Sequence, residues 1–231
     1  MSVAIGLPAP PSIALHWVKN NVIAAVLSSV VSLVLFGLRQ VTGAADADAG
    51  LATVAILYVA AIGLWAFYGA ASGVLTGAVL QRIVPRLPVW TWIALHVAGA
   101  VIIGIINEMT QTNSVRDRPA ANDEAVLAVL LLGAILGAML GAISGALEAL
   151  VLRRAASGTL SWIVWSAIAF AVGWSLLSTS LRLSEFGNDF PGQLAGEALS
   201  FVANLIMTLL MLPALRRLKS PTLSGAAQHF T

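Results

Sequence analysis

The chain contains no cysteine and has few charged residues for its length. The absence of cysteine excludes disulfides, thiolate metal sites, iron–sulfur clusters and a cysteine nucleophile. Only 10% of the 231 residues are charged and 59% are hydrophobic, whereas about 25% are charged in ordinary soluble domains. A soluble domain of this size cannot hide so much apolar surface from water. We therefore expect lipid to cover it.

The sequence also lacks the motifs of the common active sites. It has no zinc-binding spacing, no phosphate-binding loop and no paired carboxylates inside an apolar run, so we expect no metal site and no cofactor. The net charge of +2 comes from basic residues at the ends of apolar runs, where membrane topology explains them. We therefore expect no nucleic-acid partner.

Six long apolar runs contain no Asp, Glu, Lys or Arg. A bilayer core is crossed by a helix of roughly 20 apolar residues, so each run predicts one membrane span. The runs extend from Val22 to Leu38, Leu51 to Leu80, Leu87 to Asn107, Ala125 to Leu147, Ala155 to Leu181 and Ala198 to Leu215. The fold class is predicted to be all-α, a polytopic membrane bundle of six transmembrane helices.

The basic residues predict the orientation of the bundle. One side carries Lys19, Arg82, Arg86, Arg153, Arg154, Arg216, Arg217 and Lys219, and the other carries Arg39, Arg116, Arg118 and Arg182. The richer side is expected to be cytoplasmic, with both termini there, in a bacterial cytoplasmic membrane. The segment from Met1 to Ser12 does not resemble a cleavable signal peptide, so we expect the first helix to direct insertion.

Five tryptophans lie near the predicted cytoplasmic ends of the first, third and fifth helices. An indole ring prefers the headgroup boundary of a membrane, because one edge is polar and the rest is apolar. The sequence therefore predicts membrane anchors at Trp17, Trp90, Trp92, Trp162 and Trp165.

A weak internal repeat has a period of 72 residues. Gly69–Trp90 aligns without gaps on Gly141–Trp162 with nine identities in 22 positions, and Trp17 marks a further start about one period earlier. We expect three helical hairpins within a single domain of residues 1–219, at about 13–86, 87–157 and 158–219. A flexible tail is expected at 220–231. Repeats related by rotation about the membrane normal occur in some transporters.

The segment Gly141–Arg154, followed by Trp162, resembles a loose group of uncharacterised bacterial multi-helix membrane proteins. In these proteins a glycine-spaced helix ends in a polar residue and an arginine pair, and a tryptophan opens the next helix. The resemblance covers about the middle 100 residues and implies a similar hairpin-repeat fold, without an activity. Glu148 departs from the pattern, because glutamine is usual at that position.

Glycines recur every fourth residue in the second and fourth predicted helices. Residues four apart share a helix face, and glycine there lets another helix backbone approach closely. The sequence predicts a packed centre formed by these two helices, with a partner subunit as the alternative occupant of the glycine faces. The helix-packing glycines are Gly69, Gly73, Gly77, Gly133, Gly137, Gly141 and Gly145.

Three ionisable residues lie at membrane depth, where such residues are functional candidates by default. His96 is interpreted as a hydrogen-bonded packing residue, with pigment or cofactor binding as the alternative. Glu148 lies one turn before an arginine pair, where it can snorkel, and Glu197 lies near the outer end of the sixth helix. With Ser144 and Asn204, the two glutamates are the candidates for a transport path.

An enzyme is not expected. Six helices with a serine on the fourth invite comparison with rhomboid-type intramembrane proteases, but that family needs a serine in G-x-S-G and a histidine on the sixth helix. Here Ala142 replaces the first glycine, and the sixth helix has no histidine to act as base for Ser144.

Three functions stay open at this point. The leading hypothesis is a non-catalytic accessory or assembly subunit of a larger membrane complex, because buried polar groups are few and an outer loop from Glu108 to Glu124 is long enough to touch a partner. The first alternative is a small-solute or ion transporter or channel. The second is a pigment- or lipid-binding protein.

Overall fold

The computed structural model describes residues 11–43, 50–113, 123–183 and 190–219. These residues form seven helices, and six of them are long and apolar enough to cross a bilayer, so the protein is an integral membrane protein. The helices are α1 (Pro11–Thr42), α2 (Leu51–Ile83), α3 (Val89–Asn113), α4 (Asp123–Leu152), α5 (Thr159–Leu183), α6 (Phe190–Leu210) and the short α7 (Leu212–Arg217). The predicted six-helix membrane bundle is confirmed.

The first span begins earlier than its apolar run predicted, and the last span is divided into two helices near its end. Helix α1 starts at Pro11, well before Val22, because proline has the backbone angle of a first helical turn and needs no hydrogen-bond partner there. The candidate span thus also contains His16, which the sequence analysis had left outside. At the other end Met211 interrupts the helix, and Pro213 in the next turn has no N–H to donate.

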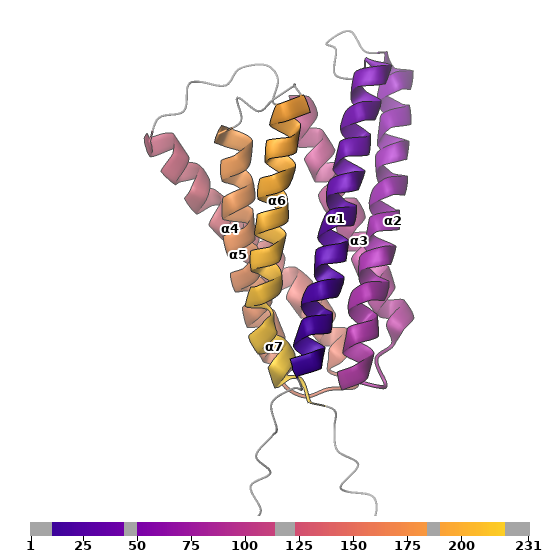
Figure 1. Cartoon of the computed structure of the whole chain (residues 1–231), viewed down its shortest axis with the longest axis vertical. Coiled ribbons are helices and arrows are strands. Elements are labelled where there is room, and N and C mark those ends of the chain that lie inside the picture. Colours follow the sequence, from indigo (N-terminus) through magenta and orange to yellow (C-terminus); the bar gives the residue numbers. More distant parts are fainter. Residues whose placement is uncertain (1–10, 44–49, 114–122, 184–189, 220–231) are drawn as a thin grey trace, which may run out of the picture.

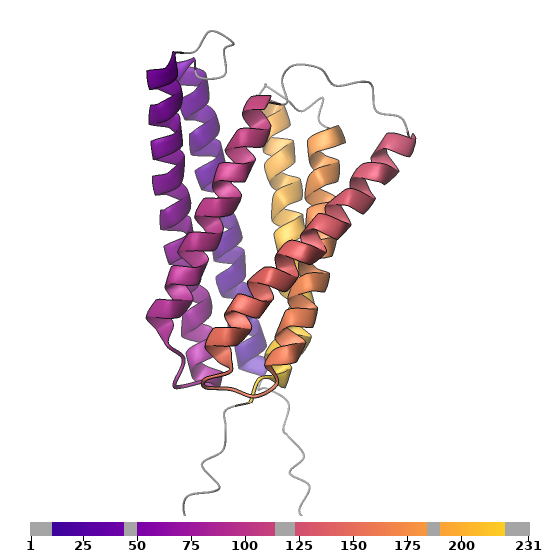
Figure 2. The same ribbon diagram turned by 180° about the vertical axis from the view of Figure 1, so that it is seen from behind.

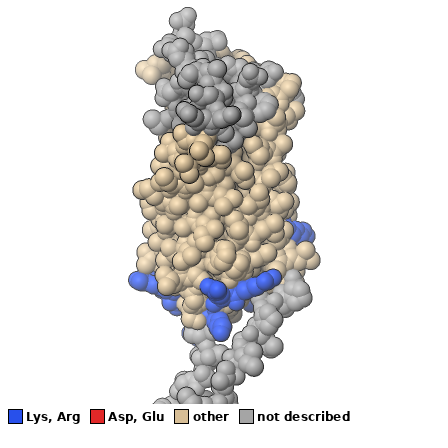
Figure 3. Space-filling view, turned by 90° about the vertical axis from the view of Figure 1, so that its left-hand side faces the viewer, with Lys and Arg blue, Asp and Glu red and all other residues tan. Residues whose placement is uncertain are grey.

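Helices α1 to α6 run alternately along the bundle, so the described chain begins and ends at the same end (Figure 1). Exposed lysines and arginines gather at this basic end, below a broad surface without charged side chains (Figure 3). The exposed basic residues there are Lys19, Arg82, Arg86, Arg153, Arg154, Arg216, Arg217 and Lys219. An apolar belt bounded by a basic edge is what a membrane-spanning bundle needs.

The six spans form a ring with one weak seam. The order of contact around the ring is α3, α2, α1, α6, α5 and α4, and only α3 and α4 touch slightly. Figure 2 shows these two helices side by side at the basic end and spread apart toward the other end. The ring therefore has a line along which it is weakly closed.

The glycines of α2 and α4 account for the two most extensive contacts in the ring. A Cβ atom added to Gly69 would lie 2.6 Å from the carbonyl oxygen of His96, and one added to Gly145 would lie 2.7 Å from Cβ of Ser166. Real Cβ atoms do not approach so closely, so only glycine permits these helix separations. Helix α2 thus packs on α3, and α4 packs on α5.

The prediction that α2 and α4 form the packed centre of the bundle is wrong, although their glycines do pack within the chain. The glycine faces of α2 point to α3 and those of α4 point to α5, and α2 and α4 make at most marginal contact with each other. Short connections at the basic end hold each sequential pair antiparallel, so the glycine faces meet their nearest neighbours in the chain.

The two glycine-packed pairs cross the boundaries expected between hairpin units. The expected middle unit, 87–157, pairs α3 with α4, which form the weak seam. The unit boundaries stay a sequence prediction, but close packing follows the turns at the basic end, 84–88 and 153–158. We name the α2–α3 pair the first glycine hairpin and the α4–α5 pair the second glycine hairpin.

The largest buried cluster lies toward the basic end and draws on both glycine hairpins, α1 and α7. We name it the basal cluster; its largest side chains are those of Trp17, Leu80, Trp92, Leu152, Trp162 and Leu215. The cluster joins the two hairpins below the region where α3 and α4 diverge. It therefore links the two hairpins at this end of the bundle.

The interpretation of the tryptophans as membrane anchors is wrong for three of the five. Trp17, Trp92 and Trp162 are 4%, 1% and 1% exposed, whereas Trp90 is 84% exposed. Trp90 and Trp92 lie two residues apart and therefore point to different sides of α3. Only one of that pair can face the surroundings of the protein.

The end of the described chain is tied to the turn between α4 and α5. The N–H of Ser157 donates to the carbonyl of Lys219 at 2.9 Å, and the N–H of Lys219 donates to the carbonyl of Ser157 at 3.3 Å. The adjacent Gly158 has φ of 84°, and a Cβ there would meet the carbonyl oxygen of Arg217. This turn therefore requires glycine.

Several predicted features lie outside the described residues. They are the flexible tail 220–231, Arg116 and Arg118 of the less basic side, and the side chains of the expected partner loop from Glu108 to Glu124.

We predict that Gly137→Ala destabilises the bundle, while Gly63→Ala does not. A Cβ at position 137 would meet the carbonyl oxygen of Phe170 and lie 2.7 Å from Cβ of Trp174, whereas nothing lies within 4 Å at position 63. We expect a loss of about 1–3 kcal/mol for the first variant, because overpacking displaces a whole helix. The free energy of unfolding in detergent micelles measures it.

Gly63→Ala is the matched control, because both sites are glycines inside a membrane helix and gain the same methyl group. Equal stability of the two variants would contradict the close α4–α5 contact.

Candidate functional site

A partly open cavity of about 230 Å³ lies inside the ring and is lined by residues from all six spans. Most of its wall is apolar, but polar side chains converge on it from every helix. The polar lining residues are Asn21, Tyr68, Ser72, Thr76, His96, Ser144, Glu148, Ser166 and Thr208. A concave site with a few convergent polar groups is the usual form of a small-molecule site.

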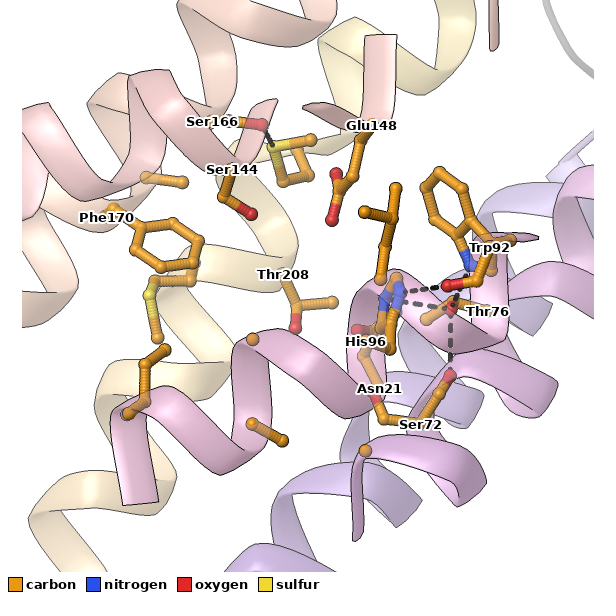
Figure 4. A pocket seen from close by; sticks show the side chains of 18 of the residues that line it. Asn21, Ser72, Thr76, Trp92, His96, Ser144, Glu148, Ser166, Phe170 and Thr208 are labelled. Carbon is orange, nitrogen blue, oxygen red and sulfur yellow. Dashed lines mark hydrogen bonds between the residues drawn. The ribbon is translucent and has the colours of Figure 1, made fainter. Parts of the chain in front are cut away.

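The first glycine hairpin contributes a hydrogen-bonded cluster around Thr76. The Thr76 hydroxyl donates to the carbonyl of Ser72 at 2.8 Å and accepts from Nε1 of Trp92 at 3.0 Å. The ring of His96 bridges the two helices, with Nε2 3.4 Å from the Thr76 hydroxyl and Nδ1 3.1 Å from the carbonyl of Trp92 (Figure 4). The cluster fixes the indole and the imidazole against each other at the cavity wall.

The second glycine hairpin contributes Glu148 in the corresponding place. Its Oε2 accepts a hydrogen bond from Nε1 of Trp162 at 2.6 Å. Ser144, one turn earlier on α4, points to the same space, and His96 faces both residues from the opposite wall (Figure 4). Glu148 therefore lies against the cavity, and its carboxylate does not snorkel to the basic end.

The two hairpins repeat one arrangement with different chemistry. In each, a tryptophan on the second helix donates its indole N–H to an oxygen on the first: Trp92 to Thr76, and Trp162 to Glu148. Trp92 lies 16 residues after Thr76, whereas Trp162 lies 14 residues after Glu148. The gapless alignment of the two hairpins therefore needs a shift of two residues beyond the turn. Trp92, and not Trp90, is the counterpart of Trp162.

The same shift of two residues relates the side chains that pack against the glycines in the two hairpins. A Cβ at Gly73 would touch His96, and a Cβ at the aligned Gly145 would touch Ser166. The first hairpin thus carries threonine and histidine where the second carries glutamate and serine. An acidic group and a basic group therefore stand on opposite walls of the cavity.

Three tryptophans separate the cavity from the basic end. The ring centroids of Trp17 and Trp162 are 5.9 Å apart at 81°, and those of Trp92 and Trp162 are 6.1 Å apart at 72°. Such edge-to-face contacts are the favoured aromatic geometry. Because all three belong to the basal cluster, they close the cavity on that side.

Of the candidates proposed from the sequence, His96, Ser144 and Glu148 meet at the cavity, while Glu197 and Asn204 do not line it. Glu197 accepts a hydrogen bond from Nε2 of Gln193 at 3.0 Å and also bonds with serine side chains of α1. The side-chain amide of Asn204 donates to the carbonyl of Ser200 at 2.9 Å, within its own helix. Glu197 therefore belongs to the α1–α6 contact, and Asn204 bonds within α6.

The sequence analysis missed the polar residues that complete the wall. Ser72 and Thr76 align with Ser144 and Glu148 at the 72-residue period. The alignment could therefore have identified Ser72 and Thr76 as candidates for the cavity wall. No pattern pointed to Asn21, because it reaches the cavity only through the packing of α1 on the ring.

The geometry bears on two of the earlier alternatives. Nδ1 of His96 donates to the carbonyl of Trp92, and Nε2 lies 3.4 Å from the Thr76 hydroxyl, so a pigment metal bound at Nε2 would displace that contact. Among the described residues no hydrogen bond joins Ser144 to His96 or Glu148, although nucleophilic catalysis needs a base in contact with the serine. The arrangement suits binding of a small molecule by polar contacts.

We predict that Thr76→Val destabilises the protein by about 1–3 kcal/mol, because it leaves the buried N–H of Trp92 without its acceptor. Valine keeps the shape of threonine, so the loss reports the hydrogen bond. Thr42→Val is the control, since its exposed hydroxyl bonds only to the carbonyl of Leu38. Thermal unfolding of both variants in detergent micelles tests this prediction. Equal losses of stability in the two variants would count against the Thr76 cluster.

Comparisons of the chain with protein-family models, with curated proteins and with solved structures found no match. The resemblance at Gly141–Arg154 therefore stays a prediction.

Proposed function

We propose that this protein is a non-catalytic integral membrane protein that binds a small polar solute in its central cavity and carries it across the membrane. The observation that supports this proposal is the convergence of His96, Ser144 and Glu148 on one cavity at membrane depth. Ionisable residues are costly there and mark solute pathways when they face the interior of a bundle. The solute would enter along the divergence of α3 and α4.

The two glycine hairpins, as copies of one unit, suit this function. Transporters commonly move one repeat against another around a fixed site between them. Here the cavity lies between the hairpins, which touch each other slightly along the α3–α4 seam and are joined by the basal cluster. In our proposal, opening of the basal cluster and closing of the seam expose the site to the other side.

The basic end is proposed to face the cytoplasm of a bacterium, because lysines and arginines stay on that side during insertion. Both termini then lie in the cytoplasm. In this orientation the basal cluster closes the cytoplasmic side of the cavity, and the described arrangement is the one open away from the cytoplasm.

An accessory or assembly subunit of a larger membrane complex is the second candidate. The slight contact between α3 and α4 favours it, because a helix of a partner fits between diverging helices. We rank it below transport. The main support for an accessory subunit was that the sequence has few buried polar groups, but the polar groups that it has converge on one cavity, which favours solute binding. Purification from the native membrane in mild detergent tests it, and a partner present in equal amount would favour it.

We predict that a single cysteine at position 144 is reached by water. Because the chain has no cysteine, Ser144→Cys places one thiol in the cavity. In liposomes we expect a small membrane-impermeant methanethiosulfonate to label it, since thiols react as thiolates in contact with water. Mass spectrometry of the intact protein measures the labelled fraction.

Leu147→Cys is the control, because Leu147 lies on the same helix and is 46% exposed on its outer face, where lipid excludes the reagent. Failure of Ser144→Cys to react above this control would contradict a water-filled binding cavity.

A further inference from the structure

Two threonine hydroxyls of the cavity wall already donate to backbone carbonyls. The Thr76 hydroxyl donates its proton to the carbonyl of Ser72 at 2.8 Å, and the Thr208 hydroxyl donates to the carbonyl of Asn204 at 2.8 Å. A hydroxyl has one proton and two acceptor positions. Neither threonine therefore has a proton left for a ligand, while the oxygen of Thr208 can still accept.

Two indole N–H groups of the wall, and one N–H of an asparagine amide, are committed in the same way. The indoles of Trp92 and Trp162 donate to Thr76 and Glu148. The side-chain amide of Asn21 donates to the carbonyl one turn earlier on α1 at 2.9 Å. The amide oxygen of Asn21 takes no part in that bond, so it stays available as an acceptor.

Glu148 is the strongest acceptor at the cavity wall, because it is a carboxylate. Its Oε2 accepts from Trp162, which leaves Oε1 for another donor. A carboxylate offers about four acceptor positions and, when ionised, no donor. Glu148 is also the carboxylate that lines the cavity among the described residues, and His96 on the opposite wall donates Nδ1–H to the carbonyl of Trp92.

The remaining wall is apolar. Leu95, Ala169, Phe170 and Met207 line the cavity beside the polar groups. The volume of about 230 Å³ exceeds the roughly 150 Å³ of an apolar cavity that holds benzene. The space thus suits a small organic body with one polar end better than a bare metal ion.

We infer that the transported solute is a small organic ammonium ion, whose N–H groups bind Glu148 Oε1 and the acceptor oxygens of Asn21 and Thr208 while its apolar part packs on Phe170 and Met207. This inference rests on the proposed function and names its substrate class. The charge of the ammonium group is balanced by the carboxylate, which is the condition for holding either at membrane depth.

The Ser144→Cys reporter tests the charge preference of the cavity. In liposomes we compare two methanethiosulfonates of similar size, one carrying a quaternary ammonium and one a sulfonate. We expect the cationic reagent to label the thiol about tenfold faster or more, because a charged cleft concentrates ions of the opposite sign. Adding Glu148→Gln should abolish the difference.

Glu197→Gln in the same background is the matched control, since it makes the same chemical change at a carboxylate outside the cavity. It should leave the preference intact. No labelling by either reagent would contradict the proposed function itself. Equal labelling by both, or a preference that survives Glu148→Gln, would leave a water-filled cavity and overturn the ammonium assignment.

A protection experiment on the Ser144→Cys variant tests the ammonium assignment even if the Glu148→Gln variant does not fold. n-Butylammonium should slow labelling in a saturable way, whereas n-butanol and potassium ions at the same concentration should not. Protection by n-butanol would assign the site to neutral solutes, and protection by potassium would assign it to inorganic cations; either result overturns the inference.

Discussion

Close backbone contact within the two glycine hairpins is the constraint on which the rest of the bundle depends. Glycine faces on α2 and α4 draw α3 and α5 so near that a methyl group at Gly69 would meet the backbone of His96. At this separation Trp92 reaches Thr76, and Trp162 reaches Glu148. The glycine faces thus join each helix to its neighbour in the chain and do not join the hairpins to each other. The tryptophan-rich basal cluster joins them instead, and above it the ring encloses a cavity.

The asymmetry of the hairpins is what gives the cavity its chemistry. Each hairpin has a tryptophan that donates to the partner helix, but the residues around it differ, so one wall holds Thr76 and His96 and the other holds Glu148 and Ser166. A carboxylate at membrane depth is expensive unless something balances its charge. The indole N–H of Trp162 meets part of that need at 2.6 Å, and a cation in the cavity would meet the rest.

The sequence predicted the fold well because apolar length is a local property. Six charge-free runs predicted six spans, and the basic residues were assigned correctly to one end of the bundle. The pairing of helices was harder, since glycine spacing identifies a packing face but not its partner, and α2 and α4 were wrongly expected to form the packed centre. Trp92 was mistaken for an anchor because burial depends on which side of α3 faces the ring. His96, Ser144 and Glu148 were found from residue type and depth alone, whereas Asn21 and Thr208 depend on how α1 and α6 close the ring.

The central claim is that a small ammonium ion binds beside the bond between Trp162 and Glu148. Nitrogen-15 nuclear magnetic resonance of the indole N–H groups tests it directly, because the chain has seven tryptophans and each gives one signal. The signal assigned by Trp162→Phe should shift in a saturable way as n-butylammonium is added to the protein in micelles. The signal of the exposed Trp90 should stay in place. An unchanged Trp162 signal, or equal shifts at both residues, would contradict binding at Glu148.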